Sequence, residues 1–177
     1  MSDPAPPTSE QGPSRLDEFN RLSDEAVAEL LRPCLDVERW VATIVEQRPY
    51  SNVEALLKVA REAADPLTGS ELEAALAHHP RIGQRAAGGS PEAALSRSEQ
   101  AGLERGADLE QRLATGNEAY EKRFGRVFLI RAAGRSTEEI LAQLEARLDN
   151  DPESEDRVVA GQLREIAVLR LSGRVAE

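Results

Sequence analysis

One of the two histidines in this chain stands where an acid–base group could be held rigidly. His79 is followed directly by Pro80, and then by Arg81, Ile82 and Gly83. Because a proline disfavours helical geometry in the residue before it, we expect a helix to stop at His79. An imidazole changes charge near neutral pH, so a histidine fixed at a helix end could donate or accept a proton.

The helix that should position His79 is indicated by its own start signal. Ser70 followed three residues later by Glu73 is typical of a capping box and predicts a helix from about residue 71 towards residue 78. Leu72, Leu76 and His79 then have i, i+4 and i+7 spacing, which places the imidazole on an apolar stripe. From spacing alone an alternative stays open, because a histidine on such a stripe is more often a satisfied core residue than a catalyst.

A second group of polar residues follows in a helical region that begins near residue 90. Ser96, Glu99, Gln100 and Leu103 have i, i+3, i+4 and i+7 spacing and therefore share one helix face. This face could be the polar wall of a pocket. It could equally be a solvated face that includes one leucine, and periodicity does not choose between the two.

A cation stands on the apolar face of the last predicted helix. Val159, Leu163, Ile166 and Arg170 share one stripe. A buried guanidinium requires a carboxylate or a similar anion. The alternatives are a structural salt bridge, or an aliphatic stem that lies along the surface with its charged end in water.

Length and composition favour a single all-α domain of about seven to nine helices. The chain has 177 residues, 3% aromatic side chains and many helix-forming Ala, Leu, Glu and Arg residues. Residues 1–14 are rich in proline, serine and acidic residues and are predicted to be a disordered tail, so the helical domain spans residues 15–177. The apolar run 127–130 is predicted to be a buried connector, either helical or extended, since no second strand is indicated.

Charge and cysteine content exclude several classes of function. A formal net charge of −10 argues against binding to nucleic acid or to an anionic membrane, and no apolar run is long enough to span a bilayer. Cys34 is the sole cysteine, which fits a reducing cytoplasm and leaves no cysteine cluster for a metal. No signal-peptide pattern, phosphate-binding loop or dinucleotide fingerprint is present.

A set of short motifs between residues 19 and 171 is typical of one protein family. In chain order they are Phe19-Asn20, Trp40, Arg48-Pro49-Tyr50, His79-Pro80-Arg81-Ile82-Gly83, Ser96-x-x-Glu99-Gln100, Ala101-Gly102-Leu103, Asn117-x-x-Tyr120-x-x-Arg123-Phe124-Gly125, Phe128, Arg147-Leu148-x-Asn150 and Ile166-x-x-x-Arg170-Leu171. With these motifs the chain resembles the family of 2-oxo-4-hydroxy-4-carboxy-5-ureidoimidazoline (OHCU) decarboxylases of uric acid breakdown. It departs from the family pattern at Arg123, where a lysine is usual, and at Arg126-Val127, which replaces a more apolar pair.

The resemblance implies an all-α homodimer that converts OHCU to (S)-allantoin and carbon dioxide without a metal or an organic cofactor. Arg81 and Arg85 are two further cations that could reach the site. By residue, the resemblance assigns His79 as the catalytic acid or base, Glu99 as its acidic partner, Ser96, Gln100 and Arg170 as substrate contacts, and Pro80 and Ile130 as lining.

These residue types suit the reaction. The substrate has a carboxylate on a carbon beside a C=N group. This group can accept the electrons released with carbon dioxide, so no cofactor is needed as an electron sink. An imidazole supplies the proton transfer, and Arg, Ser and Gln side chains orient a ring rich in N–H and C=O groups. Two alternatives remain: a helical interaction module in which these residues form a structural network, or the same site acting on a different ureido or ring compound.

Overall fold

The structure is a computed structural model that describes residues 13–77, 79–84, 88–103 and 106–176, and these residues form helices and loops without a strand. This confirms the all-α prediction and its range of seven to nine helices. The nine helices in the described residues are α1 (Arg15–Arg21), α2 (Asp24–Leu31), α3 (Glu38–Glu46), α4 (Val53–Ala63), α5 (Gly69–Leu76), α6 (Pro91–Glu99), α7 (Ala107–Phe124), α8 (Thr137–Arg147) and α9 (Pro152–Val175).

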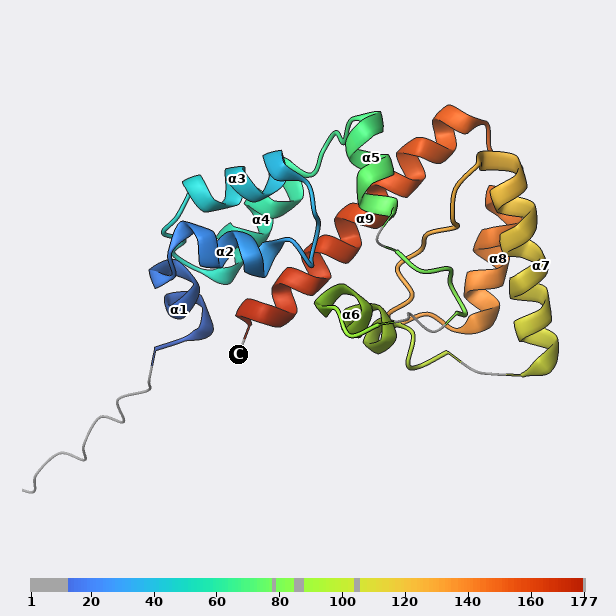
Figure 1. Cartoon of the computed structure of the whole chain (residues 1–177), viewed down its shortest axis with the longest axis horizontal. Coiled ribbons are helices and arrows are strands. Elements are labelled where there is room, and N and C mark those ends of the chain that lie inside the picture. The colour runs from blue at the N-terminus through green and yellow to red at the C-terminus, as the bar shows by residue number, and fades with distance from the viewer. Residues whose placement is uncertain (1–12, 78, 85–87, 104–105, 177) are drawn as a thin grey trace, which may run out of the picture.

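The long helix α9 crosses the molecule and connects its two ends (Figure 1). Helices α1 to α4 gather at one end, where α1 and α4 pack on α9 and α3 packs between α2 and α4. Helices α7 and α8 pack against each other at the other end. α5 and α6 lie beside the middle of α9, so residues that follow α5 and residues of α6 are brought near the same stretch of that helix.

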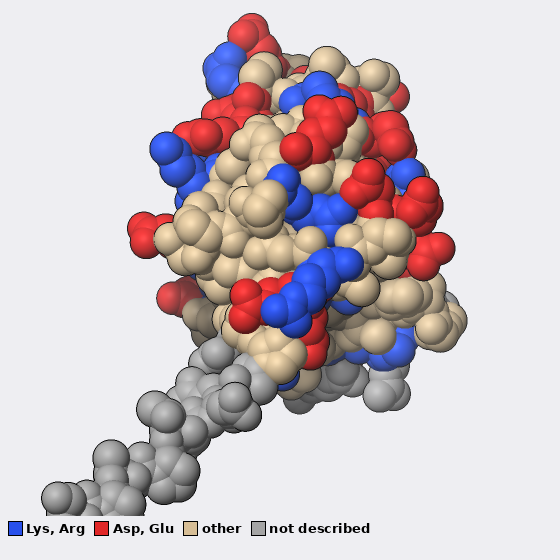
Figure 2. Space-filling model, turned by 90° about the vertical axis from the view of Figure 1, so that its left-hand side faces the viewer, with Lys and Arg blue, Asp and Glu red and all other residues tan. Residues whose placement is uncertain are grey.

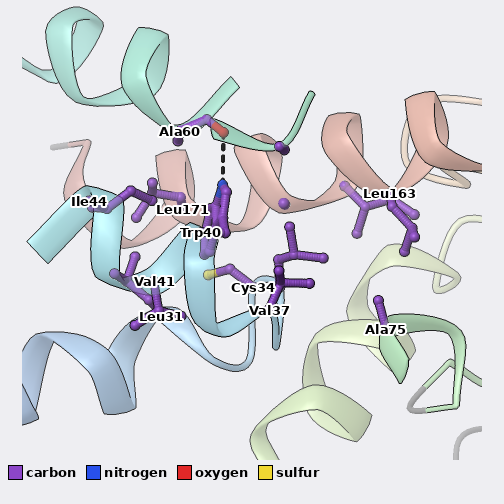
Figure 3. Close-up of a cluster of buried hydrophobic side chains, with 14 of the residues drawn as sticks. Leu31, Cys34, Val37, Trp40, Val41, Ile44, Ala60, Ala75, Leu163 and Leu171 are labelled. Atoms are coloured by element: carbon purple, nitrogen blue, oxygen red, sulfur yellow. Dashed lines mark hydrogen bonds between the residues drawn. The ribbon is translucent and has the colours of Figure 1, made fainter. Parts of the chain in front are cut away.

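The larger core lies between α9 and the first four helices. Trp40 is fully buried, and its indole Nε1 donates a hydrogen bond of 2.7 Å to the carbonyl oxygen of Ala60, as Figure 3 shows. Ile44 from α3 and Leu163 and Leu171 from α9 are buried in the same cluster. Because a buried indole N–H needs an acceptor, this bond fixes α3 against the end of α4 as well as filling the core.

A second, smaller core lies between α7, α8 and the segment 128–132. Tyr120, Phe128, Ile140 and Leu144 are all fully buried there. Gly116 allows the two helices to approach closely, because a Cβ atom at this position would lie 2.3 Å from a methyl carbon of Leu144. Residues of both cores line the site described below.

The start of α5 corrects one expectation. Its N-cap is Thr68 rather than Ser70, and the reciprocal capping bonds join Thr68 to Glu71 rather than Ser70 to Glu73. Both pairs fit the capping-box pattern, so local sequence could not separate them. The carboxylate of Glu71 is also held by Arg39 of α3, a tertiary contact that favours the earlier start.

The end of α5 also comes earlier than expected. The last helical residue is Leu76, and the backbone N–H of His79 donates to the carbonyl of Leu76 at 3.0 Å in the turn that follows. His79 is therefore half-buried beyond the helix instead of on its apolar stripe, while Leu72 and Leu76 are buried as predicted. The restriction that Pro80 imposes on His79 is compatible with this non-helical position.

The connector after α7 is buried, as predicted, and of the helical and extended alternatives the structure shows a non-helical one. Phe128, Leu129 and Ile130 are each at most 5% exposed. Side chains replace a sheet as hydrogen-bond partners of its backbone: the Arg131 N–H donates to Gln162 Oε1 at 2.9 Å, and Arg147 donates to the Leu129 carbonyl at 2.8 Å. Such partners are required because unpaired backbone groups are costly in a core.

Residues 1–12 of the predicted tail lie outside the described residues, and Ser14 forms the capping box of α1. Acidic and basic side chains are interspersed over the face made by the α1–α4 end (Figure 2). None of the helices in the described part of the chain is long and apolar enough to cross a membrane.

The Glu71 carboxylate gives the fold a testable dependence on pH. Hydrogen bonds from Arg39, followed by the Thr68 N–H, lower the pKa of Glu71 from 4.5 to about 2. A carboxylate with a lowered folded-state pKa contributes its full stabilisation above its unfolded pKa and loses it as the pH falls through the folded value. Glu71→Gln should therefore lower the urea midpoint at neutral pH and have much less effect near pH 2. Glu73→Gln, exposed on the same helix, is the control, and an equal loss at both pH values would contradict this account.

Candidate active site

A small polar cavity lies where the residue 79–82 segment, α6, the 128–132 connector and α9 meet. Its polar wall is formed by His79, Ser96, Glu99 and Gln100. Its volume is about 20 Å³, which is room for one water-sized molecule. The apolar lining consists of Pro80, Ile82, Phe128, Leu129, Ile130, Ala132 and Ile166. Six of the seven predicted site residues therefore surround one cavity.

The seventh predicted residue, Arg170, binds two of the other six. Its Nε and Nη2 atoms donate to the two carboxylate oxygens of Glu99 at 2.5 and 2.9 Å, and Nη2 also donates to Ser96 Oγ at 3.2 Å. The Arg170 side chain is 3% exposed, so this is a buried, bidentate ion pair between α9 and α6. The carboxylate that the buried guanidinium requires belongs to the protein, so the structure shows the salt-bridge alternative of the sequence analysis.

A backbone carbonyl completes the environment of Arg170. Nη1 donates to the carbonyl oxygen of Pro33, in the turn between α2 and α3, at 2.9 Å. A guanidinium has five N–H donors, and the contacts to Glu99, Ser96 and Pro33 engage four of them. The group is therefore rigidly oriented, and no acceptor within the described part of the chain takes the second Nη1 hydrogen.

Glu99 lines the same cavity as His79, and the resemblance assigns it as the acidic partner of that histidine. Its carboxylate accepts two hydrogen bonds from Arg170. The buried cation fixes the carboxylate in position, since an unpaired guanidinium there would be strongly unfavourable.

Gln100 is oriented by the loop that follows His79. As the C-cap residue of α6, it accepts a hydrogen bond of 3.0 Å at Oε1 from the backbone N–H of Gly83. An N–H group can only donate, so this contact identifies the amide oxygen and directs the Nε2 donor elsewhere. The same side chain lines the cavity.

A second cavity of about 240 Å³ adjoins the site, because His79 and Arg170 line it as well. Its other walls include Ala75, Ser90 and the turn that contains Cys34. Burial raises the pKa of the Cys34 thiol to about 11, so at neutral pH this cysteine is protonated and a poor nucleophile. The inner cavity of about 20 Å³ is too small for a substituted ring, whereas the adjoining cavity of about 240 Å³ is not.

Two contributors to the site were missed by sequence reasoning. The Pro33 carbonyl is a backbone group, which has no residue-type signal. Arg147 holds the carbonyl of Leu129 in the lining; it appeared only as one residue of the family pattern. Arg81 and Arg85 were the two further cations that could reach the site. Arg81 forms an ion pair with Glu121 at 2.5 Å, and Arg85 lies outside the described residues.

The arrangement combines a group for proton transfer with groups for orientation. His79 can exchange a proton near neutral pH, Gln100 and Ser96 can form hydrogen bonds, and the Glu99–Arg170 pair holds opposite charges at fixed positions. Among the described residues, no three His, Cys, Asp or Glu side chains cluster as metal ligands. Such a site is suited to acid–base chemistry on a polar ring compound.

Comparison with known proteins supports the same class of chemistry. The sequence model of the OHCU decarboxylase family matches residues 20–172. The OHCU decarboxylase of Haloferax volcanii is 29% identical over 90% of this chain and 95% of its own length. That of Amia calva is 33% identical over 87% of this chain and 90% of its own length.

A solved structure shares the fold. The crystal structure of an OHCU decarboxylase in the presence of (S)-allantoin superposes with a TM-score of 0.68 at 24% identity, covering 88% of this chain and 100% of that one. A family match over most of the chain, together with the arrangement of the seven site residues, gives one conclusion. The chain belongs to the OHCU decarboxylase family.

Proposed function

We propose that this protein decarboxylates OHCU to (S)-allantoin and carbon dioxide in uric acid degradation, with His79 as the proton-transfer group. The observation that carries the proposal is the arrangement of His79, Ser96, Glu99 and Gln100 around one cavity, with Arg170 binding two of them. They come from the loop after α5, from α6 and from α9. Membership of the OHCU decarboxylase family supports the substrate.

The reaction needs an electron acceptor and a proton donor. When the bond between the ring carbon and the carboxylate breaks, its electron pair is accepted by the adjacent C=N group and carbon dioxide leaves. The nitrogen of that group takes one proton, and the hydroxyl on the carbon that lost carbon dioxide gives up its proton to become a carbonyl. The carbon of the former C=N group receives a proton on one face, which sets the configuration of allantoin. General acid–base catalysis by His79 would contribute roughly 10²–10⁴-fold to the rate.

The remaining groups orient the substrate. The Nε2 donors of Gln100 suit a ring or ureido carbonyl, and the remaining Nη1 hydrogen of Arg170 suits an anionic or carbonyl oxygen. Glu99, held by Arg170, can accept a hydrogen bond from the substrate hydroxyl. Pro80 and Ile130 supply apolar walls that limit access of water to the reacting carbon.

A structural polar network is the second candidate, because Arg170, Glu99 and Ser96 do bind one another. The cavity favours the enzyme, since a network that served only packing would not need a cavity lined by a histidine and three other polar residues. A related ring or ureido compound as substrate is the third candidate and is included in the test below.

We also propose a homodimer in the cytoplasm, without nucleic-acid or membrane partners. The single buried cysteine and the net charge of −10 support the compartment and the absence of such partners, and the resemblance supports the dimer. Light scattering during size-exclusion chromatography tests the dimer directly.

The activity is tested with OHCU generated in the cuvette from urate by the two preceding enzymes. We expect the protein to accelerate the loss of OHCU absorbance and to give a circular dichroism signal of one allantoin enantiomer. If OHCU decayed no faster than in buffer and the allantoin formed were racemic, as in buffer, OHCU would be excluded as the substrate. Related ureido acids would then be assayed by carbon dioxide release, and inactivity with all of them would favour the structural network.

A further inference from the structure

We infer that Asn117 of α7 is a positioning residue that sets the orientation of Gln100 through a single peptide group. The inference rests on the proposed function for its kinetic consequence, and its structural part stands without it. Asn117 lies outside the cavity and is 3% exposed. Its contact with the site is indirect.

The link consists of two hydrogen bonds on opposite sides of the Ile82–Gly83 peptide. Asn117 Nδ2 donates to the carbonyl oxygen of Ile82 at 3.0 Å, and the N–H of Gly83 donates to Gln100 Oε1 at 3.0 Å. This carbonyl and this N–H belong to the same planar unit, so they cannot turn independently. Hydrogen bonds in such a chain also polarise and strengthen one another.

Three residues on one face of helix α7 contact the segment 81–83. Leu113, Asn117 and Glu121 are spaced four residues apart and therefore lie on the same face of the helix. Glu121 binds the Arg81 guanidinium. Leu113 packs so closely that a Cβ at Gly83, whose φ is +84°, would lie 3.3 Å from its Cδ1. Three consecutive residues, 81 to 83, are thus each fixed by α7.

The consequence for the site is the direction of the Gln100 amide. While Gly83 donates to Oε1, Nε2 is the group left to face a substrate carbonyl. If the Ile82–Gly83 peptide can rotate, the two ends of the Gln100 amide can exchange, and an acceptor then faces the substrate oxygen. Binding should weaken, because a polar pair is replaced by two acceptors.

The test is a double-mutant cycle between Asn117 and Gln100. Asn117→Leu removes the donor at similar volume and is expected to reduce kcat/KM about 10-fold, the size of one lost hydrogen bond, mainly through KM. Gln100→Leu should have at least this effect, and the double variant should be no worse than Gln100→Leu alone. Arg112→Leu, which removes an ion pair with Glu145 from the same helix, is the control and should leave kcat/KM unchanged.

Hydrogen exchange of the Gly83 amide supplies a measurement that does not depend on activity. Exchange should accelerate in Asn117→Leu and in Gln100→Leu but not in Arg112→Leu. If Asn117→Leu does not fold, Glu121→Gln weakens the neighbouring contact at Arg81 and should give smaller changes in the same direction. Additive effects on kcat/KM, or unchanged Gly83 exchange, would overturn the inference. An inactive wild type with the expected exchange pattern would instead overturn the proposed function alone.

Discussion

Replacing His79 with asparagine is expected to slow OHCU decarboxylation by about 10²–10⁴-fold, the usual contribution of a positioned acid–base group. Asparagine keeps a polar side chain in a cavity wall but cannot change charge near neutral pH. The allantoin formed should also be racemic, because the proton would then arrive from solvent on either face. The two readouts are the initial rate of OHCU loss and the circular dichroism of the allantoin formed.

Loss of binding must be separated from loss of proton transfer in this variant. Calorimetric titration with (S)-allantoin should give an affinity within a few fold of wild type, because the Gln100 and Arg170 contacts are unchanged. Gln100→Leu should show the opposite pattern, with weakened binding and a smaller change in kcat. A His79→Asn protein that turned over OHCU at the wild-type rate would assign the proton transfer to another group.

Replacing Arg147 with methionine is expected to lower the free energy of unfolding by about 3–5 kcal/mol, as when one partner of a buried ion pair is removed. Arg147 donates to Glu155 Oε1 from Nε at 2.9 Å and from Nη2 at 2.6 Å, and Glu155 is fully buried. Tyr120 and Asn150 donate to the same carboxylate. Without Arg147 these neutral donors remain, but the carboxylate loses its counter-charge.

Urea unfolding followed by circular dichroism measures this loss. Arg112→Met is the matched control, because the Arg112–Glu145 pair is solvent-exposed and such pairs are worth less than about 1 kcal/mol. Arg147 also donates to the Leu129 carbonyl in the site lining, so any folded Arg147→Met protein should have reduced activity as well. Equal losses for the two arginine variants would show that the buried pair contributes no more than the exposed one.

Several features were determined by the sequence alone, because they depend on residues close together along the chain. Helical periodicity placed Arg170 on the buried face of α9 and Ser96, Glu99 and Gln100 on one side of α6. Helix-forming composition and capping signals predicted the all-α class, and the capping box at Ser136 is present as its pattern suggests. The His79-Pro80 pair indicated a helix end close to His79, although α5 ends earlier, at Leu76.

Only the tertiary structure decided which partners these residues have. Arg170 binds Glu99, 71 positions away, and the carbonyl of Pro33, 137 positions away. The tertiary bond from Arg39 to Glu71 accompanies the choice of one capping box over another. Contacts of this range depend on how helices pack, and many end on backbone carbonyl or N–H groups that every residue carries. Residue type therefore indicated which side chains could do chemistry, and packing determined what each one touches.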